Sequence, residues 1–176
     1  RASRNGEWAV IDGTTSGKSR QRMLISLRGK AAPLVLESVG QNSALLGAWV
    51  FRDAQPILCG LVGREGVVID LRDMSRRAFE VCKPGVAEGT GGFWQLRFAP
   101  AGRRAAIGVV IEPLKNARVV YRIVDFDSAR YWDLSFGLNQ GELYWLNNES
   151  LVARPWNERY YAFSADGAER RPLPYK

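Results

Sequence analysis

The sequence predicts an all-β protein made of antiparallel hairpins, and three observations support this prediction. Short apolar runs of five to eight residues, rich in Val, Ile, Leu and aromatic side chains, are separated by Gly, Asp, Asn and Pro, which is typical of strands joined by turns. Apolar residues at helical spacing are nearly absent; the best helical segment, 20–28, fits a strand equally well and ends at Gly29. The runs also recur at an interval close to that of propeller blades.

The expected strands form three complete series of four, each with a tryptophan at the matching place. These tryptophans, Trp49, Trp94 and Trp145, are 45 and 51 residues apart. The series comprise strands at about 47–52, 56–62, 66–71 and 77–82, then 93–98, 104–111, 118–126 and 130–134, then 142–146, 151–154, 159–164 and 169–173. Three earlier runs, at 8–11, 23–27 and 34–39, predict an incomplete first unit. We therefore expect one β domain over 1–176, with units at about 7–40, 46–83, 92–135 and 141–175.

Two short motifs carry a resemblance to a known fold family. The turn Phe98-Ala-Pro-Ala-Gly102 precedes an apolar strand, and Tyr131-Trp-Asp-Leu134 closes the same unit. They resemble the Phe-Ser-Pro-Asp-Gly turn and the terminal Trp-Asp pair of β-propeller blades, of the WD-repeat and exported bacterial kind. A third run, Phe163-Ser-Ala-Asp-Gly167, resembles the same turn. The resemblance implies a propeller-like array of three to four four-stranded antiparallel units. A β-sandwich is the alternative fold.

Charge and composition narrow the range of partners. Apolar residues make up 46% of the chain and charged residues 24%, and no stretch approaches the roughly 20 apolar residues of a transmembrane helix. The net charge of +7 is spread along the chain without a run of four basic residues, whereas nucleic-acid binders usually concentrate positive charge. We expect no nucleic acid, no membrane insertion and a preference for acidic partners.

The chain contains no histidine, which excludes histidine-based catalytic triads and histidine metal sites. Its two cysteines, Cys59 and Cys82, fall on expected strands separated by a third. Such strands lie about 9–10 Å apart, beyond the roughly 7 Å that a disulfide spans, although pairing stays open. We expect no metal, no cofactor and no catalytic residues.

Two motifs suggest ligand chemistry but fit turns better. The run Trp8–Asp12 followed by Gly13–Ser19 resembles a strand entering a phosphate-binding loop, but only three residues separate Gly13 from the Gly-Lys pair, where the motif needs four. Asp125 and Asp127 form an Asp-x-Asp pair without an evident third ligand. We predict a hairpin loop in the first case and turn hydrogen bonds in the second.

Aromatic residues concentrate near the C-terminus, where nine of nineteen fall between Tyr131 and Phe163. Tyr, Trp and Arg are enriched at protein-interface hot spots. The predicted binding residues are Trp145, Arg154, Trp156, Arg159 and Tyr160, with Trp8 and Trp94 as further candidates. This pattern favours a non-catalytic protein-binding module, such as an inhibitor or immunity-type protein, whose partner is another protein with an acidic surface.

Two alternatives remain open. One is a carbohydrate-binding or glycoside-cleaving propeller, which needs two carboxylates about 5–10 Å apart; no spacing among the eighteen acidic residues singles out a pair. The other is a fragment of a larger propeller. Arg1 in place of an initiating methionine and the β-rich pattern favour export, to the periplasm or the medium. The excess of arginine over lysine, with abundant alanine and glycine, favours a bacterial source.

Overall fold

The computed structural model describes residues 1–15, 19–29, 31–40, 47–52, 55–82, 94–110, 119–137, 141–155, 159–167 and 170–174. These residues form fifteen strands and no helix. Each of the four sheets is a meander in which neighbouring strands are also consecutive in sequence. The predicted all-β, antiparallel, propeller-like array is therefore confirmed. Among the described residues, no helix has the length and apolar character needed to cross a membrane.

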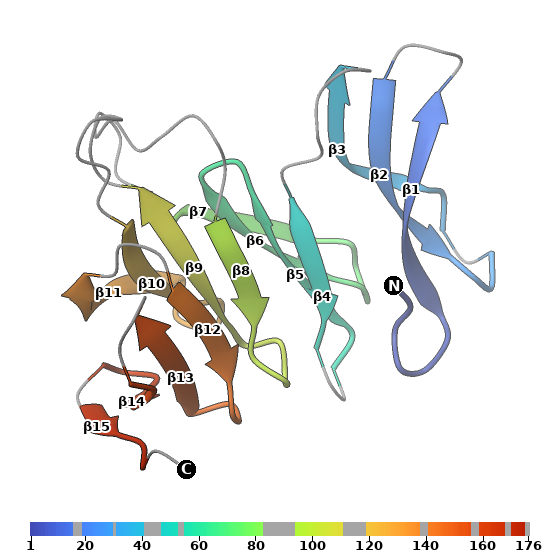
Figure 1. The fold of residues 1–176 in the computed structure, drawn as a ribbon. Helices are drawn as coiled ribbons and strands as arrows, with labels where there is room; N and C mark the ends of the chain where they lie inside the picture. The colour runs from blue at the N-terminus through green and yellow to red at the C-terminus, as the bar shows by residue number, and fades with distance from the viewer. Residues whose placement is uncertain are drawn as a thin grey trace. The chain divides into compact units, whose positions relative to one another are not determined.

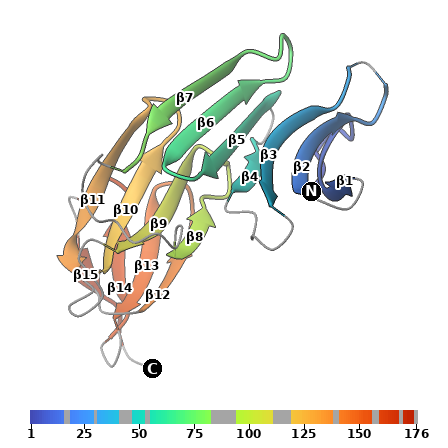
Figure 2. The ribbon, with the colours of Figure 1, turned by 90° about the horizontal axis from the view of Figure 1, so that it is seen from above.

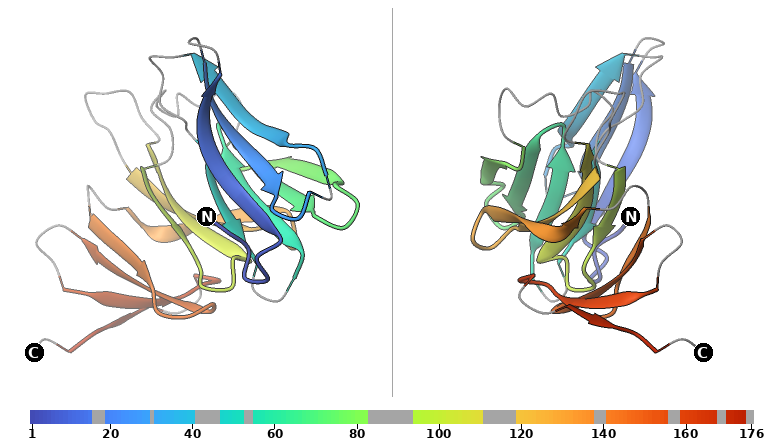
Figure 3. Two further views of the ribbon diagram at one scale, coloured as in Figure 1. Left: turned by 90° about the vertical axis from the view of Figure 1, so that its right-hand side faces the viewer. Right: turned by 60° about the vertical axis from the view of Figure 1, so that its left-hand side comes forward.

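The N-terminal sheet has three strands, drawn in shades of blue in Figures 1 and 3, in the order β1-β2-β3. They are β1 (Trp8–Thr15), β2 (Ser19–Ser26) and β3 (Leu34–Gly40). The β1–β2 connection joins two antiparallel strands in hairpin register, from Trp8 opposite Ser26 to Thr15 opposite Ser19. Residues 8–15 and Ser19 of the phosphate-loop-like run therefore lie on two paired antiparallel strands, whereas residues 16–18, the predicted hairpin loop, lie outside the described residues.

The other three sheets have four strands each, and Figure 2 shows the order of strands within them. They comprise β4 (Ala48–Phe51), β5 (Ile57–Val62), β6 (Glu65–Asp70) and β7 (Arg76–Glu80); β8 (Trp94–Phe98), β9 (Arg104–Val110), β10 (Val119–Asp125) and β11 (Arg130–Gly137); and β12 (Gly141–Trp145), β13 (Ser150–Pro155), β14 (Tyr161–Ser164) and β15 (Arg170–Pro172).

Turn chemistry explains why the strands end where they do. Gly102 has a φ of 70° and its N–H donates to the Ala99 carbonyl at 2.9 Å. Gly167 repeats this arrangement, with a φ of 76° and a 2.9 Å hydrogen bond to the Ser164 carbonyl. A positive φ favours glycine because it has no Cβ. Both glycines close the turns on which the propeller resemblance rested.

The chain divides into two compact units, Arg1–Gly63 with Val67–Arg77, and Arg64–Gly66 with Ala78–Lys176. In the first, strands β1 to β6 contribute to one core, which includes Val10, Leu24, Trp49, Leu58 and Ile69. The prediction of a single domain over 1–176 stays a prediction.

The core of the second unit draws on two of the four-stranded sheets. Tyr121 and Ile123 of β10 pack in one cluster with Leu143 of β12 and with Leu151 and Phe163 of the strands that follow it. Side chains two residues apart on a strand share a face, so each of these sheets contributes one face to this core.

The three tryptophans do not occupy matching places. Trp49 pairs with Gly60 on the next strand, and Trp94 pairs with Gly108, but Trp145 pairs with Leu151. The Trp49 indole fits over Gly60 because no Cβ stands in its way, whereas Trp145 faces a leucine position on the next strand.

Candidate functional site

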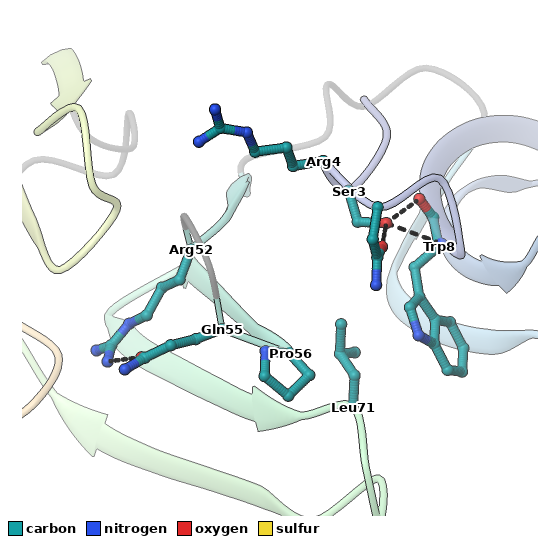
Figure 4. A pocket seen from close by; sticks show the side chains of 8 residues that line it. Ser3, Arg4, Trp8, Arg52, Gln55, Pro56 and Leu71 are labelled. Atoms are coloured by element: carbon teal, nitrogen blue, oxygen red, sulfur yellow. Dashed lines mark hydrogen bonds between the residues drawn. The ribbon is translucent and has the colours of Figure 1, made fainter.

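A pocket of about 410 Å³ lies in the first unit, and Figure 4 shows the side chains around it. Its size falls in the range of small-molecule sites, roughly 300–1,000 Å³. The lining residues come from the segment before β1, the β4–β5 connection and the end of β6: Ser3, Arg4, Asn5, Trp8, Arg52, Gln55, Pro56 and Leu71.

One wall of the pocket is a tight turn that precedes β1. The Trp8 N–H donates to the Ser3 hydroxyl at 3.0 Å, and that hydroxyl lies 2.7 Å from Asn5 Oδ1. The turn closes at Gly6, whose φ of 66° is in the left-handed region and whose N–H donates to the Ser3 carbonyl at 3.0 Å. This geometry leaves the Arg4 side chain exposed and extending away from the Trp8 indole (Figure 4).

The other wall is formed by the connection between β4 and β5. The Arg52 N–H donates to the Ile57 carbonyl at 2.9 Å, which fixes the backbone, and Arg52 Nη1 lies 3.3 Å from Gln55 Oε1. The Leu71 N–H donates to the Pro56 carbonyl at 2.8 Å and holds the end of β6 against this connection. Arg52 is buried, with 6% of its surface exposed, so its charge is placed by the fold.

The described residues of the lining combine positive charge with apolar surface, and none of them carries a carboxylate. Arg4 and Arg52 supply two guanidinium groups, which stay charged at any physiological pH. Within the described part of the chain, Arg4 has no hydrogen bond or ion pair. Guanidinium groups bind carboxylates and phosphates through paired hydrogen bonds. The pocket is therefore suited to a small anionic ligand that also presents an apolar face, here to Trp8 and Leu71.

The residues predicted to bind a partner are only partly brought together. The Arg154 guanidinium lies 5.2 Å from the centre of the Tyr160 ring, and the Tyr160 hydroxyl lies 3.2 Å from Glu142 Oε2. Arg159 is exposed next to Tyr160. These residues gather where β12 begins and β13 ends, because Glu142 pairs with Arg154.

Two other predicted residues do not join this cluster. Trp145 lies at the opposite end of β12, and its Nε1 donates to the Arg97 carbonyl at 2.9 Å. Trp145 therefore links two sheets of the second unit. Trp156 lies outside the described residues, as does the side chain of Trp94. The binding role predicted for this set stays a prediction.

The Asp-x-Asp pair forms turn hydrogen bonds, as predicted. Asp125 Oδ1 accepts from the N–H groups of Asp127 and Ser128 at 2.9 and 3.0 Å, and Arg104 Nε lies 3.1 Å from Asp125 Oδ2. Burial acts to raise the pKa of Asp125, but these hydrogen bonds outweigh it and hold the pKa below its ordinary value. Asp133 likewise has a structural role, 2.6 Å from Nε of the buried Arg122.

One pair of carboxylates shares a partner in the first unit. Arg22 Nε lies 2.7 Å from Asp12 Oδ1, and Arg22 Nη1 lies 3.8 Å from Glu37 Oε2. The hydrogen bond from Arg22 lowers the pKa of Asp12. A glycosidase's general acid needs a raised pKa, so Asp12 is poorly suited to that role.

Sequence reasoning missed most of the pocket and named only Trp8 among its residues. Arg4 and Arg52 are 48 positions apart and belong to no motif. The one available signal was Ser3-Arg-Asn-Gly6, a turn-forming run beside a strand.

No protein-family model matches the sequence, and no curated protein matches it either. The fold does match solved structures. An oligogalacturonate lyase in complex with manganese superimposes with a TM-score of 0.59 at 14% identity, over 97% of this chain and 50% of the lyase chain. A 6-phosphogluconolactonase-like protein of Bacteroides uniformis superimposes with a TM-score of 0.48 at 13% identity. The match covers 98% of this chain and 52% of the chain of that protein.

The lyase has a propeller-type fold, and this chain shares a propeller-like fold with it. The chain spans about half the length of the structures it matches.

The comparison corrects the functional prediction. The sequence favoured a non-catalytic protein-binding module of the inhibitor or immunity type, and no enzyme activity. A solved structure of similar fold is instead named as a lyase, and this finding contradicts the predicted reading. It relied on the absence of an evident catalytic motif, but function depends on the residues of a site and cannot be excluded from the fold or from a missing motif.

The manganese of the lyase has no matching ligand set in the described part of this chain. The sequence holds no histidine, and the described residues contain no group of three or more Cys, Asp or Glu side chains placed to hold a metal ion. Mn²⁺ favours carboxylate, carbonyl and water ligands, whereas the pocket presents two guanidinium groups. The residues that the structure describes do not fit that metal.

Proposed function

We propose that this chain is part of a carbohydrate-active propeller enzyme and that its pocket binds an acidic sugar. The observation that carries the proposal is that Arg4, Arg52 and Trp8 line one cavity of about 410 Å³, in which none of the described lining residues carries a carboxylate. The fold neighbour named as a lyase of oligogalacturonate supports the same class of substrate, because galacturonate is a sugar that carries a carboxylate.

The lining offers a partner for each part of such a ligand. The guanidinium groups of Arg4 and Arg52, which lie on different walls of the pocket (Figure 4), would each pair with a carboxylate of the ligand. Trp8, Pro56 and Leu71 would cover the apolar C–H face of the ring. The amides of Asn5 and Gln55 would hydrogen-bond the ring hydroxyls, since each amide both donates and accepts.

This pocket would bind the substrate and neutralise its charge. Cleavage of a glycosidic bond needs groups that give or take a proton, and the described residues of the lining include neither a carboxylate nor a histidine. Groups beyond the lining would therefore carry the bond-breaking step. This division of roles agrees with a chain that spans half of the lyase's length.

The proposal is tested by calorimetric titration of the chain with trigalacturonate. Arg4→Gln should weaken binding at least about tenfold, since a charged hydrogen bond contributes roughly 1.5–3 kcal/mol. Arg4 is exposed, so the substitution should leave the thermal transition unchanged. The matched control is Arg171→Gln, which removes an exposed arginine on β15. An equal loss of affinity in both variants would mean that the change in net charge alone weakens binding, and it would contradict the proposed site.

A second measurement addresses cleavage. The chain is incubated with oligogalacturonate, and product lengths are followed by mass spectrometry with and without Gln55→Ala. Shortening of the oligomer that slows in the variant supports an enzyme acting through this pocket. Binding without shortening would limit the role of this chain to substrate binding.

A further inference from the structure

A carboxylate lies in the turn that forms one wall of the pocket. Glu7 is located between Asn5 and Trp8, which both line the pocket, although Glu7 is not itself a lining residue. Its side chain is partly buried, with 27% of its surface exposed. A negative charge beside a site for an anionic ligand repels that ligand unless the charge is neutralised. The contacts of Glu7 therefore influence how well the pocket binds an anion.

One oxygen of this carboxylate is bound by Asn5. Asn5 Nδ2 donates to Glu7 Oε2 at 2.9 Å, and the Glu7 N–H donates to Asn5 Oδ1 at 3.2 Å. Asn5 Oδ1 also accepts from the Ser3 hydroxyl at 2.7 Å. Together these hydrogen bonds orient the Asn5 amide and join the Glu7 carboxylate to the turn that carries Arg4.

The other oxygen of the carboxylate faces Arg28, which follows β2 by two residues. Arg28 Nη1 lies 3.1 Å from Glu7 Oε1. The main chain brings the two side chains together, because the Leu27 N–H donates to the Glu7 carbonyl at 2.8 Å. Arg28 is exposed and is not a lining residue. An exposed ion pair of this kind contributes little to stability, but here it places a positive charge against the carboxylate that adjoins the pocket.

We infer that Arg28 is a specificity-determining residue of the pocket, which favours anionic ligands by neutralising the Glu7 carboxylate. The inference rests on the proposed function, because it takes the ligand to be an acidic sugar. Arg28 acts through Glu7 and is therefore a positioning residue. Removing its guanidinium would leave the negative charge of Glu7 beside the pocket, where this charge would repel the carboxylates of the ligand.

Calorimetric titration of the chain with trigalacturonate at two salt concentrations tests the inference. Arg28→Gln should weaken binding about threefold to fivefold in about 0.02 M NaCl, the effect of one charge several ångströms away near a protein surface. The loss should shrink below about twofold in about 0.5 M NaCl, because salt screens the interaction. The matched control is Arg20→Gln, which removes an exposed arginine from the other end of β2. It should change the affinity less than about twofold at either concentration.

Two further variants separate the role of charge from a structural role. Adding Glu7→Gln to Arg28→Gln should restore the affinity to within about twofold of wild type, because the amide keeps the shape of the side chain without its charge. Arg28→Lys keeps the positive charge and should bind as wild type does. A loss in Arg28→Gln that persists at high salt, or that Glu7→Gln does not restore, would assign Arg28 a structural role and overturn the inference.

The same titrations distinguish failure of this inference from failure of the proposed function. Trigalacturonate binding that is unchanged in Arg28→Gln would overturn the role of Arg28 alone and leave the acidic-sugar pocket in place. A folded wild-type chain that binds no trigalacturonate would overturn the acidic-sugar pocket, and the role of Arg28 with it.

Discussion

The Trp49 indole lies directly over the α-carbon of Gly60, so that a Cβ at position 60 would collide with Cε3, Cδ2 and Cζ3 of the ring. The two residues pair across β4 and β5, and Trp49 is 4% exposed. The bulk of the tryptophan is accommodated only because the facing position lacks a side chain.

Gly60→Ala should therefore destabilise the chain by about 1–3 kcal/mol, the usual range for overpacking a core. The measurement is urea unfolding. The double variant Gly60→Ala with Trp49→Leu should be less destabilised than the two single effects added together, because the collision is removed. Strictly additive effects would contradict the contact.

The turn at Asp125 should make stability depend on pH. Its pKa is lower in the folded chain, so its contribution is present above the unfolded value of about 3.9 and is lost as pH falls through the folded value. Asp125→Ala should lower the unfolding free energy by about 1–3 kcal/mol at pH 7. The difference from wild type should shrink below about pH 4. A difference that is the same at pH 7 and pH 3 would refute the role of the carboxylate, and Glu65→Ala at an exposed position serves as the control.

Trp145 should stabilise the fold through its link to Arg97. Trp145→Phe keeps an aromatic ring but removes the donor to the Arg97 carbonyl, and the loss should be about 1 kcal/mol in thermal or urea unfolding. Trigalacturonate binding should be unaffected because Trp145 does not line the pocket. Unchanged stability in Trp145→Phe would contradict the structural role of this hydrogen bond.

The sequence located the strands well where apolar residues mark them and less well where polar residues do. It placed a strand at 23–27, whereas β2 begins at Ser19. The added residues carry little apolar signal, yet Arg22 is held by Asp12 and Glu37 on the two flanking strands. Cross-strand ion pairs of this kind depend on register, which a single sequence does not reveal.

The pocket could not be predicted from the sequence for a related reason. Its two arginines belong to turns, and they approach one cavity only because β1 and β4 contribute to the same core. Cys59 and Cys82, by contrast, are buried thiols, as the expected strand separation favoured. Local patterns therefore predicted elements and turns, whereas the site arises from contacts between segments distant in sequence.

The most direct test of the proposed function compares trigalacturonate with its fully methyl-esterified form by calorimetry. The two ligands share ring and hydroxyl groups and differ in the carboxylates that Arg4 and Arg52 would bind. The proposal predicts that the acid binds at least about tenfold more tightly than the ester and that added salt narrows the gap. Equal affinity for both forms, or binding of neither, would contradict an acidic-sugar site in this pocket.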